Sequence, residues 1–224
     1  MAGNPRLLRA DLHVHTYRSP DGIMRPSDLI GGCKKAGIDC VAVTDHNSIA
    51  GALEVAKESP FQVIVGEEIM TSEGELIGLF LEEVIPRGLS PEKTISCIRD
   101  QKGLVLVPHP FDHLRGSTIR RQALDRIVSM VDIIEVFNAR IMVPSQMARA
   151  RSLAAEHHLL SSGGSDAHTR GELGHGYVEM PGFRDASGFL ESLAEGKVRG
   201  RPSSIFVHVL TTWNKWKKKR IGMK

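Results

Sequence analysis

Cysteine is scarce in this chain of 224 residues. The three cysteines, Cys33, Cys40 and Cys97, are odd in number, and no two of them form a CxxC spacing. A disulfide framework needs paired cysteines, so the sequence argues against one. We expect reduced thiols that pack as small apolar side chains.

Long apolar runs are lacking as well. No stretch approaches the roughly 20 apolar residues that a membrane-spanning helix needs. The N-terminus also lacks the basic and then apolar pattern of a signal peptide. We therefore expect a cytoplasmic protein without a transmembrane segment.

The remaining composition is that of an ordinary globular protein, with 41% hydrophobic and 25% charged residues. The length fits one domain, and both an α/β barrel and a small doubly wound domain are compatible with it. The net charge of +3 is unevenly placed, because Trp213 to Lys224 holds six Lys or Arg residues and no acid, which leaves −3 on the rest. We expect one domain over residues 1–200 and a basic C-terminal helix or tail over residues 201–224.

Strand and helix patterns alternate along the chain. Short apolar runs indicate buried strands, and segments bounded by Pro, Ser or Gly indicate helices. The expected strands are 7–15, 40–44, 61–65, 76–81, 104–107, 132–137 and 159–162. The expected helices are 26–35, 48–59, 90–102, 117–130, 145–157 and 185–194. Ser90 is the expected N-cap of its helix, and Gly37 should end the first helix.

Metal-capable side chains follow strand after strand. His13 and His15 are separated by one residue, so both would lie on the same face of a strand. Parallel strands that alternate with helices bring their carboxyl ends to one side, which predicts one metal site at the mouth of an α/β barrel. The candidate ligands are His13, His15, Asp21, His46, Glu68, His109, Asn138, Asp166 and His168.

Each of these residues has an ordinary explanation when it is taken alone. A short motif such as His-x-His is weak evidence, and a single histidine at a strand end is more often a capping or solvated side chain. The joint spacing of the whole set favours a metal site over that alternative.

The order of the motifs resembles the PHP superfamily, the polymerase and histidinol phosphatase domains. The motifs are Asp11 to His15, Thr44-Asp45-His46, Gly66-Glu67-Glu68, Pro108-His109-Pro110 and Ser165-Asp166-Ala167-His168. With no polymerase module, the chain is similar to the stand-alone metal-dependent phosphoesterases of this family. The resemblance implies a single α/β domain built as a distorted (β/α)7 barrel, two or three divalent metal ions, and phosphoester hydrolysis.

The resemblance also implies how the ligands are shared among three sites. The first site would hold His13, His15, Glu68 and Asp166, and the third Asp21, His46 and His168. Glu68 would bridge to a second site at His109. The family often has His or Cys where this chain has Asn138, so the second site would be weaker, completed by water, or organised differently. Glu68 is the expected ligand because it stands second in its pair, which leaves Glu67 for a supporting role.

Clustered divalent ions suit phosphoester hydrolysis. They can bridge a hydroxide by lowering the pKa of water from about 15.7 toward about 7, and they bind phosphate oxygens as charge builds. The expected catalytic residues are Asp166, His168 and His46, and His168, His46 or Asp21 would assist the leaving-group proton if the third metal is absent. Nitrogen and oxygen ligands without thiolate indicate Mn, Fe or Zn.

We expect the substrates to be phosphomonoesters of nucleotides or other small phosphorylated metabolites. Four residues near strand ends could bind a phosphate: Arg115, Arg140, Arg170 and His175. The alternative is a solvated surface charge, which is as common an explanation for Arg170 and His175 and the more common one for Arg115 and Arg140.

The C-terminal segment leaves a second function class open. Lysines beside Trp213 and Trp216 could attract phosphates and stack on bases, as in a 5′-end exonuclease or an RNA-binding module. The apolar residues Val207, Leu210, Trp213 and Trp216 recur every three positions, so a helix packed on the barrel is the more common cause of this pattern. A helix on a membrane surface fits less well, because the apolar stripe is short.

Overall fold

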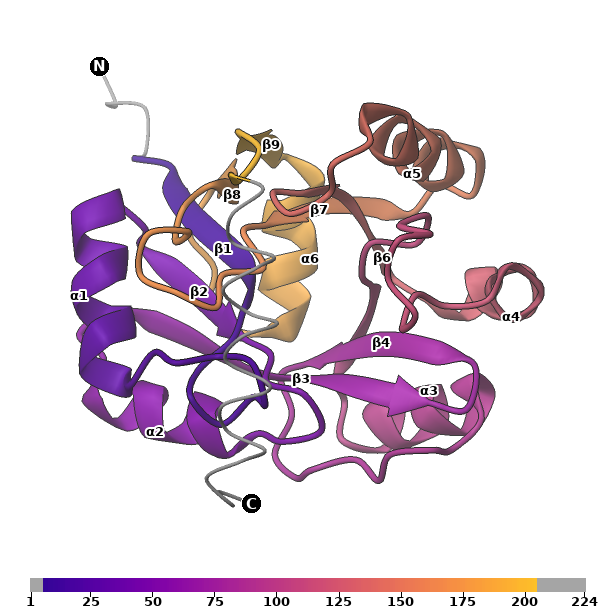
Figure 1. Ribbon diagram of the computed structural model, residues 1–224, viewed down its shortest axis with the longest axis horizontal. Coiled ribbons are helices and arrows are strands. Elements are labelled where there is room, and N and C mark those ends of the chain that lie inside the picture. Colours follow the sequence, from indigo (N-terminus) through magenta and orange to yellow (C-terminus); the bar gives the residue numbers. More distant parts are fainter. Residues whose placement is uncertain (1–5, 205–224) are drawn as a thin grey trace.

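The computed structural model describes residues 6–204, which form a strongly curved sheet with helices around it (Figure 1). The strands are β1 (Leu8–Val14), β2 (Cys40–Val43), β3 (Gln62–Thr71), β4 (Gly74–Leu79), β5 (Leu104–Val107), β6 (Ile133–Asn138), β7 (Leu160–Gly164), β8 (Gly176–Met180) and β9 (Lys197–Gly200). The helices are α1 (Pro26–Ala36), α2 (Ala50–Glu58), α3 (Pro91–Asp100), α4 (Arg121–Ile127), α5 (Pro144–Glu156) and α6 (Ala186–Ala194).

Local sequence explains where the first helices begin and end. Pro26 and Pro91 open α1 and α3, where the missing N–H of proline costs no helical hydrogen bond. Ser90 Oγ accepts a hydrogen bond from the Lys93 N–H at 3.2 Å, and Gly37 ends α1 with a left-handed φ of 70°. The predicted cap at Ser90 and the predicted stop at Gly37 are therefore confirmed.

The strands form one sheet in the order β7-β6-β5-β4-β3-β2-β1-β8-β9. Strands β1, β2 and β3 pair in parallel, as do β5, β6 and β7, whereas β4 is antiparallel to both of its neighbours. The chain that leaves β7 returns to β1, where the Asp166 N–H donates to His13 O at 2.8 Å and the His15 N–H donates to Ala167 O at 2.9 Å. The sheet is nearly closed, and the predicted single α/β domain with a distorted barrel is confirmed.

The apolar core has an inner and an outer part. One face of β1–β6 and β8 packs with α6 in an inner cluster that includes Leu12, Ile77 and Phe189. On the other face, α1 and α2 cover β1–β3, and α3, α4 and α5 cover β3–β6. This arrangement brings the carboxyl ends of the parallel strands to the same end of the barrel, where α/β barrels carry their sites.

Strand β1 changes register where its histidines begin. Its pairing with β2 shifts between Asp11 and Val14. Leu12 packs in the inner cluster, whereas Val14 packs with α1 and α2 on the outside. Regular alternation would put these two side chains on the same face. Because Leu12 points inward, regular alternation would turn His13 and His15 outward. The irregularity reverses the alternation after Leu12, so both histidines point inward.

Three parts of the fold differ from the sequence prediction. Strand β3 extends to Thr71 because β4 pairs along its second half, so Glu68 lies inside a strand and not at its end. Strands β8 and β9 are absent from the sequence prediction. Each has only four or five residues, and β9 is mostly exposed, so neither gives a clear strand pattern. The helix expected over 117–130 is confined to α4, which a short 3-10 turn at Val128–Met130 follows.

Within residues 6–204, no helix is both long enough and apolar enough to cross a bilayer. The segment Trp213 to Lys224 lies outside the described residues, so helix packing and nucleic-acid binding both remain predictions for it. The boundary after residue 200 also remains a prediction, although the last strand within residues 6–204 does end at Gly200.

Candidate metal centre

Glu68 of β3 lies among four histidines. Its Oε1 lies 3.5 Å from His13 Nε2 and 3.1 Å from His109 Nε2. Its Oε2 lies 3.3 Å from His15 Nε2 and 3.1 Å from His46 Nδ1. A carboxylate that offers each of its oxygens to two imidazoles has the geometry of a group that bridges two metal ions, since both types are ligands of divalent transition metals.

The adjacent Glu67 points away from this cluster. Its Oε2 accepts a hydrogen bond from the Ile85 N–H at 2.8 Å. Side chains alternate along a strand, so only one member of the Glu67-Glu68 pair can face inward. The member that does so is Glu68, the one that the sequence favours, whereas Glu67 binds the Ile85 N–H and does not take the supporting role expected for it.

The loop after β7 adds Asp166 and His168. Asp166 Oδ1 lies 3.4 Å from His15 Nε2, and His168 Nε2 lies 3.1 Å from Asp21 Oδ1. His46 Nε2 lies 3.8 Å from the same Asp21 oxygen. The structure therefore brings the predicted third group together beside the first, and the His15 and His168 rings stack at 4.3 Å.

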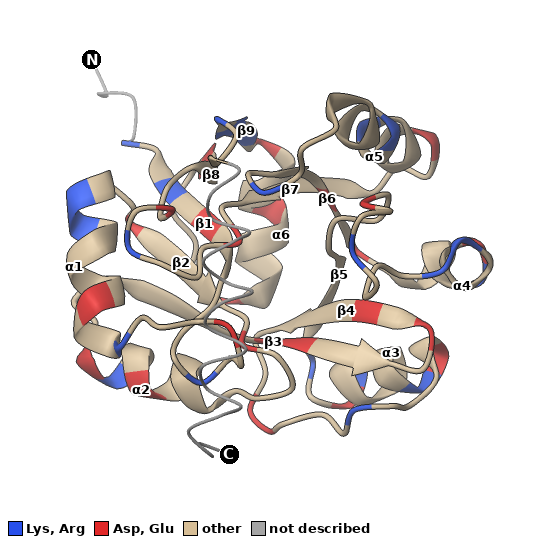
Figure 2. Ribbon diagram, in the orientation of Figure 1, with Lys and Arg blue, Asp and Glu red and all other residues tan. Residues whose placement is uncertain are grey.

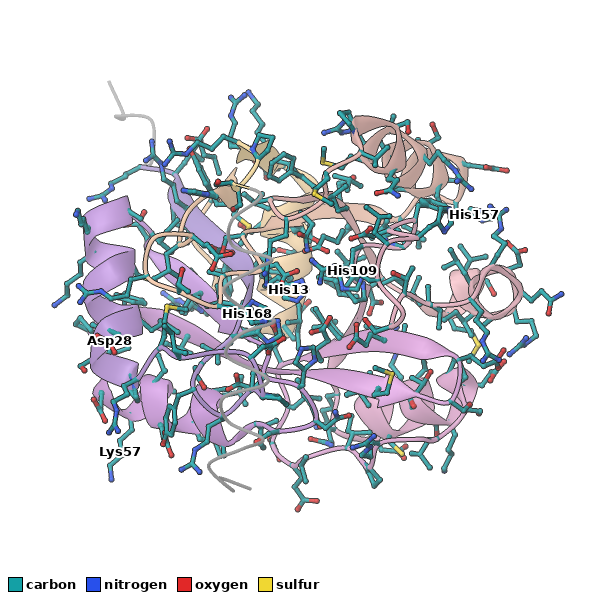
Figure 3. The ribbon with its side chains drawn as sticks, viewed as in Figure 1. His13, Asp28, Lys57, His109, His157 and His168 are labelled. Carbon is teal, nitrogen blue, oxygen red and sulfur yellow. The ribbon has the colours of Figure 1, made fainter. Side chains whose placement is uncertain are left out.

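The ligand atoms are close enough to share ions. Four trios each have one ligand atom per residue within 4.8 Å of the others: His15, His46 and His168; His13, His109 and Asp166; His13, His15 and Glu68; and His46, Glu68 and Glu75. Figure 3 shows His13, His109 and His168 gathered at the centre of the molecule, whereas His157 lies at its edge.

The backbone holds two of these residues in an uncommon conformation. Asp166 has a φ of 53° and His109 a φ of 30°, which non-glycine residues adopt rarely and at a cost of about 1–3 kcal/mol. The approach of β7 to β1 is also tight, because a Cβ on Gly164 would lie 2.4 Å from His13 Cβ. Glycine at position 164 is thus what lets Asp166 reach the histidines of β1.

Several buried polar atoms in the cluster have no hydrogen-bond partner among residues 6–204: Glu68 Oε2, Asp166 Oδ1, His109 Nδ1 and His168 Nε2. Leaving such atoms unpaired costs about 1–3 kcal/mol each. Cations held by the trios described above would satisfy the carboxylate oxygens and His168 Nε2. The donor set, mixed imidazole and carboxylate without thiolate, fits Mn, Fe or Zn.

The electrostatics of the cluster favour ionised carboxylates. Burial opposes ionisation of Asp166, but Arg115 and His13 outweigh it and hold its pKa well below the usual value. Burial likewise opposes ionisation of Glu68, yet His13 and His46 hold its pKa well below normal. Burial and the nearby His168 lower the pKa of His15 to about 3, so this imidazole is neutral and able to bind a metal at neutral pH.

Glu135 of β6 supports the cluster from behind. His13 Nδ1 donates to Glu135 Oε1 at 3.0 Å, which leaves His13 Nε2 facing the cluster. Glu135 Oε2 accepts from the His109 N–H at 2.8 Å and from Asn138 Nδ2 at 3.0 Å. No sequence motif singles out this residue. A lone acid in the apolar run Ile133 to Phe137 is its signal, because carboxylates are rarely buried unless paired.

His15 has a comparable support. Its Nδ1 lies 3.0 Å from Ser19 Oγ, and Ser19 Oγ donates to Asp45 Oδ1 at 2.8 Å. Asp45 also accepts from the Thr16 N–H at 2.7 Å. Hydrogen bonds of this kind fix the orientation of a ligating imidazole.

We predict that Glu135→Gln weakens metal binding about 10- to 100-fold, the usual loss when an outer partner of a histidine ligand is changed. The amide keeps the volume but removes the charge to which His13 Nδ1 donates. Titration of the metal-stripped protein with Mn²⁺ would measure the dissociation constants, with Glu156→Gln on the exposed face of α5 as control. Equal constants for Glu135→Gln and wild type would contradict the supporting role.

We also predict that metal affinity rises with pH between about 6 and 8. Burial opposes protonation of His13, but Glu135, Asp166 and Glu68 raise its pKa well above the usual value. Burial, with Glu68 adding to it, raises the pKa of the neighbouring Glu75 to about 8. Both groups hold a proton at neutral pH that an incoming cation must displace, so each proton released adds up to about tenfold in affinity per pH unit. Dissociation constants for Mn²⁺ at several pH values would check this, and a flat profile would contradict it.

A cavity of about 450 Å³ opens beside the cluster, lined among others by Asp21, His46, Glu75 and His168. Three arginines share this lining: Arg87, Arg115 and Arg140. Arg115 Nη2 lies 2.5 Å from Asp166 Oδ2, and Arg140 Nη1 lies 2.7 Å from His168 Nδ1. Figure 2 shows acidic segments on β3 and β4 and a basic segment where the chain enters α4.

The other predicted residues lie differently. Arg170 is 58% exposed and pairs with Asp28 of α1 at 3.5 Å, and His175 Nδ1 lies 3.0 Å from Ser203 Oγ. Neither of them lines the cavity. Asn138 is close to the cluster, with its Nδ2 donating to Asp166 Oδ2 at 3.2 Å. The ligand role of Asn138 and the substrate roles of Arg170 and His175 stay predictions.

Comparison with known proteins gives concordant results. A family model described as "PHP domain" matches residues 11–161, and one described as "PHP-associated" matches residues 144–198. An uncharacterized protein of Methanocaldococcus jannaschii is 46% identical over 146 residues, which cover 59% of this chain and 82% of that protein. A 5'-3' exoribonuclease of Haemophilus influenzae is 31% identical over 117 residues, covering 46% of this chain and 42% of that protein.

Among solved structures, the chain is similar to a two-domain protein from Bacteroides vulgatus, described as containing a predicted PHP-like metal-dependent phosphoesterase. The TM-score is 0.71 at 17% identity, and the match covers 94% of this chain and 70% of the other. At this low identity, the similarity is evidence for the fold alone.

Proposed function

Because this chain belongs to the PHP domain family, we propose that it is a hydrolase that cleaves phosphoester bonds with the help of bound divalent metal ions. Its substrates would be phosphomonoesters of nucleotides or other small phosphorylated metabolites. The family resemblance expected from the sequence motifs is confirmed by the match over residues 11–161.

One observation carries the proposal: the metal-capable cluster and an arginine-lined cavity meet at the same wall. Asp21, His46 and His168 belong to both, and the cavity of about 450 Å³ also exposes Arg115 and Arg140. Two or three Mn, Fe or Zn ions held there would lower the pKa of a coordinated water and neutralise charge on phosphate oxygens. A phosphate in the cavity would thus meet both the metal ions and the arginines.

The chain's own residues would position and protonate the substrate. Arg115 and Arg140 would bind phosphate oxygens, since a guanidinium offers paired donors in one plane. Asp166 holds Arg115 in place through a 2.5 Å contact. His46 is the most solvent-accessible of the clustered histidines, its side chain being 19% exposed. His46 or His168 would deliver the proton to the leaving alkoxide. We also propose a cytoplasmic location, where phosphorylated metabolites are found.

The test is a hydrolysis screen on protein stripped of metal and then supplied with Mn²⁺ or Zn²⁺. It would include simple phosphomonoesters, nucleotides, bisphosphorylated nucleosides and short oligonucleotides, with release of inorganic phosphate measured for the monoesters and release of mononucleotides measured for the oligonucleotides. We expect metal-dependent release from at least one phosphomonoester. Absence of hydrolysis across the panel, in protein that has bound metal, would overturn the proposal.

A 5′-end exonuclease is the second candidate. The similarity to the Haemophilus influenzae exoribonuclease favours it, as does a second hollow of about 340 Å³ that shares Arg115 with the cavity and is also lined by Arg120, Arg121 and Arg149. Several basic side chains around one hollow suit the phosphates of a nucleic-acid strand. Oligonucleotide turnover that exceeds phosphomonoester turnover in the same screen would favour this candidate.

Removal of residues 213–224 would test whether the C-terminal segment binds nucleic acid or packs on the barrel. If it binds nucleic acid, truncation should flatten the salt dependence of oligonucleotide binding, by about 0.7 in slope for each single-strand phosphate that the segment neutralises. If it packs on the barrel, the melting temperature and all activities should fall together. An unchanged salt slope with a lower melting temperature would exclude a role in nucleic-acid binding.

A further inference from the structure

We propose that Glu75 is a metal ligand in this chain, acting with Glu68 and His46 at the wall of the cavity. No motif points to this residue. The proposal rests on the proposed function, in that it assumes a cluster able to bind divalent ions. It gives the second metal site a carboxylate in addition to the bridging Glu68, beside His109 and Asn138.

The hairpin of β3 and β4 sets the position of Glu75. Met70 pairs directly with Glu75, and Glu68 pairs with Ile77, so Glu68 and Glu75 lie diagonally on the same face of the hairpin. Gly74 precedes it with a φ of 125°, and a Cβ there would lie 2.4 Å from the Cα of Ile119. Only glycine fits this turn, which holds the start of β4 firmly under the 117–119 segment.

The contacts of Glu75 place its carboxylate against known members of the cluster. Its Oε1 lies 3.4 Å from His46 Nδ1, and its Oε2 lies 3.8 Å from His109 Nε2. One ligand atom each of Glu75, Glu68 and His46 lie within 4.8 Å of one another. These distances leave room for one cation that touches all three, because metal–oxygen and metal–nitrogen bonds are about 2.0–2.2 Å long.

The burial of Glu75 makes a purely structural role costly. The residue is 2% exposed, and its Oε2 has no hydrogen-bond partner among residues 6–204. It stands beside a second buried carboxylate, Glu68, and buried like charges repel strongly unless a cation compensates them. Glu75 also lines the cavity, so an ion that it holds would be within reach of a substrate phosphate.

Asn138 does not fill the same place. Its Nδ2 donates to Glu135 Oε2 at 3.0 Å and to Asp166 Oδ2 at 3.2 Å, while its Oδ1 accepts from the Arg140 N–H at 2.9 Å. The amide group thus turns its donors toward the carboxylates and its oxygen toward the backbone. Asn138 orients neighbouring groups, and Glu75 remains the nearby carboxylate with an oxygen to offer.

The test compares full-length wild type, Glu75→Gln and Glu67→Gln. Glu67 is the matched control, a buried acid on the same hairpin whose side chain faces the Ile85 N–H and not the cluster. Each protein is stripped with a chelator, and Mn²⁺ binding is then titrated for stoichiometry and dissociation constant. Melting temperatures are recorded with and without Mn²⁺.

We expect Glu75→Gln to lose one equivalent of Mn²⁺ or to bind it at least about tenfold more weakly. Its metal-free melting temperature should equal or exceed that of the wild type, because a buried carboxyl that must either take up a proton or repel Glu68 is replaced by a neutral amide, while the rise caused by Mn²⁺ shrinks. Glu67→Gln should bind as the wild type does. Wild-type stoichiometry and affinity in Glu75→Gln would overturn the ligand role, whereas a wild type that binds no Mn²⁺ would instead overturn the proposed function.

A second variant covers the case in which Glu75→Gln folds poorly by circular dichroism. Glu75→Asp keeps the charge but shortens the side chain by one methylene, so the carboxylate withdraws from the His46 and Glu68 side. A ligand role predicts Mn²⁺ binding at least about tenfold weaker in Glu75→Asp. Unchanged affinity in this variant would overturn the proposal.

Discussion

Asp166→Asn is expected to reduce phosphoester hydrolysis by more than about a thousandfold while the barrel stays folded, because the reaction then loses a metal ion that lowers the pKa of water from about 15.7 toward about 7. Asp166 Oδ1 faces His15 at 3.4 Å, and Oδ2 faces Arg115 at 2.5 Å. The variant is nearly isosteric, and asparagine tolerates the left-handed φ of 53° about as well as aspartate does. The loss should therefore be electrostatic and not conformational.

Metal content, circular dichroism and the rate of phosphate release would be measured side by side for Asp166→Asn and wild type. Asp100→Asn at the exposed end of α3 is the control, since it removes the same charge far from the cluster. A folded Asp166→Asn protein that retains the wild-type rate would remove Asp166 from the mechanism. Loss of rate in the control would show that the assay reports on something other than the site.

Local signals in the sequence predict most of the cluster. His13 and His15 show the period of a strand, and His46, His109 and Asp166 each follow a predicted strand, so their meeting at one end of the barrel follows from parallel topology. The same reasoning reaches the α/β class and the barrel. These inferences depend on short stretches of chain, where residue type and spacing already determine the geometry.

Two acids of the site lie beyond that reasoning because tertiary structure places them. Glu135 sits in the middle of β6 and acts through His13, and Glu75 reaches the cluster only because β4 folds back antiparallel on β3. The sequence predicts strands at 61–65 and 76–81 with no helix between them, but it does not show how far the two strands pair or which side chains then meet. Glu75 lies before the predicted second strand, so the rule that functional residues follow strand ends does not find it.

The arginines also show that position in the sequence does not determine which residues reach the site. Arg170 follows the Asp166-Ala167-His168 motif in sequence, yet its side chain pairs with Asp28 on the surface. Arg87 follows no motif, yet the loop after β4 brings it to the cavity. A residue that is close to a ligand in sequence is also close to it in space when both lie at the end of the same strand. Beyond the strand end this does not hold, because a long side chain two residues after the ligand can point to either face.

Chelation of the bound metal is expected to lower the melting temperature by about 8–16 °C. An ion present at a thousand times its dissociation constant stabilises the folded state by about 4.1 kcal/mol, and 1 kcal/mol shifts the midpoint by about 2–4 °C for a domain of this size. Without an ion, Glu68 and Asp166 keep buried oxygens that have no hydrogen-bond partner among residues 6–204. An unpaired buried acceptor costs stability, and a bound ion removes that cost.

The measurement is a thermal melt of the protein before chelation, after chelation and after Mn²⁺ is added back. Recovery of the midpoint on readdition separates loss of metal from damage by the chelator. Asp166→Asn should respond less than the wild type in the same experiment, because one ligand is already missing, whereas Asp100→Asn should respond as the wild type does. Identical midpoints in all three states of the wild type would mean that the cluster of histidines and carboxylates is stable by itself, and a metal-dependent mechanism would then have no structural basis.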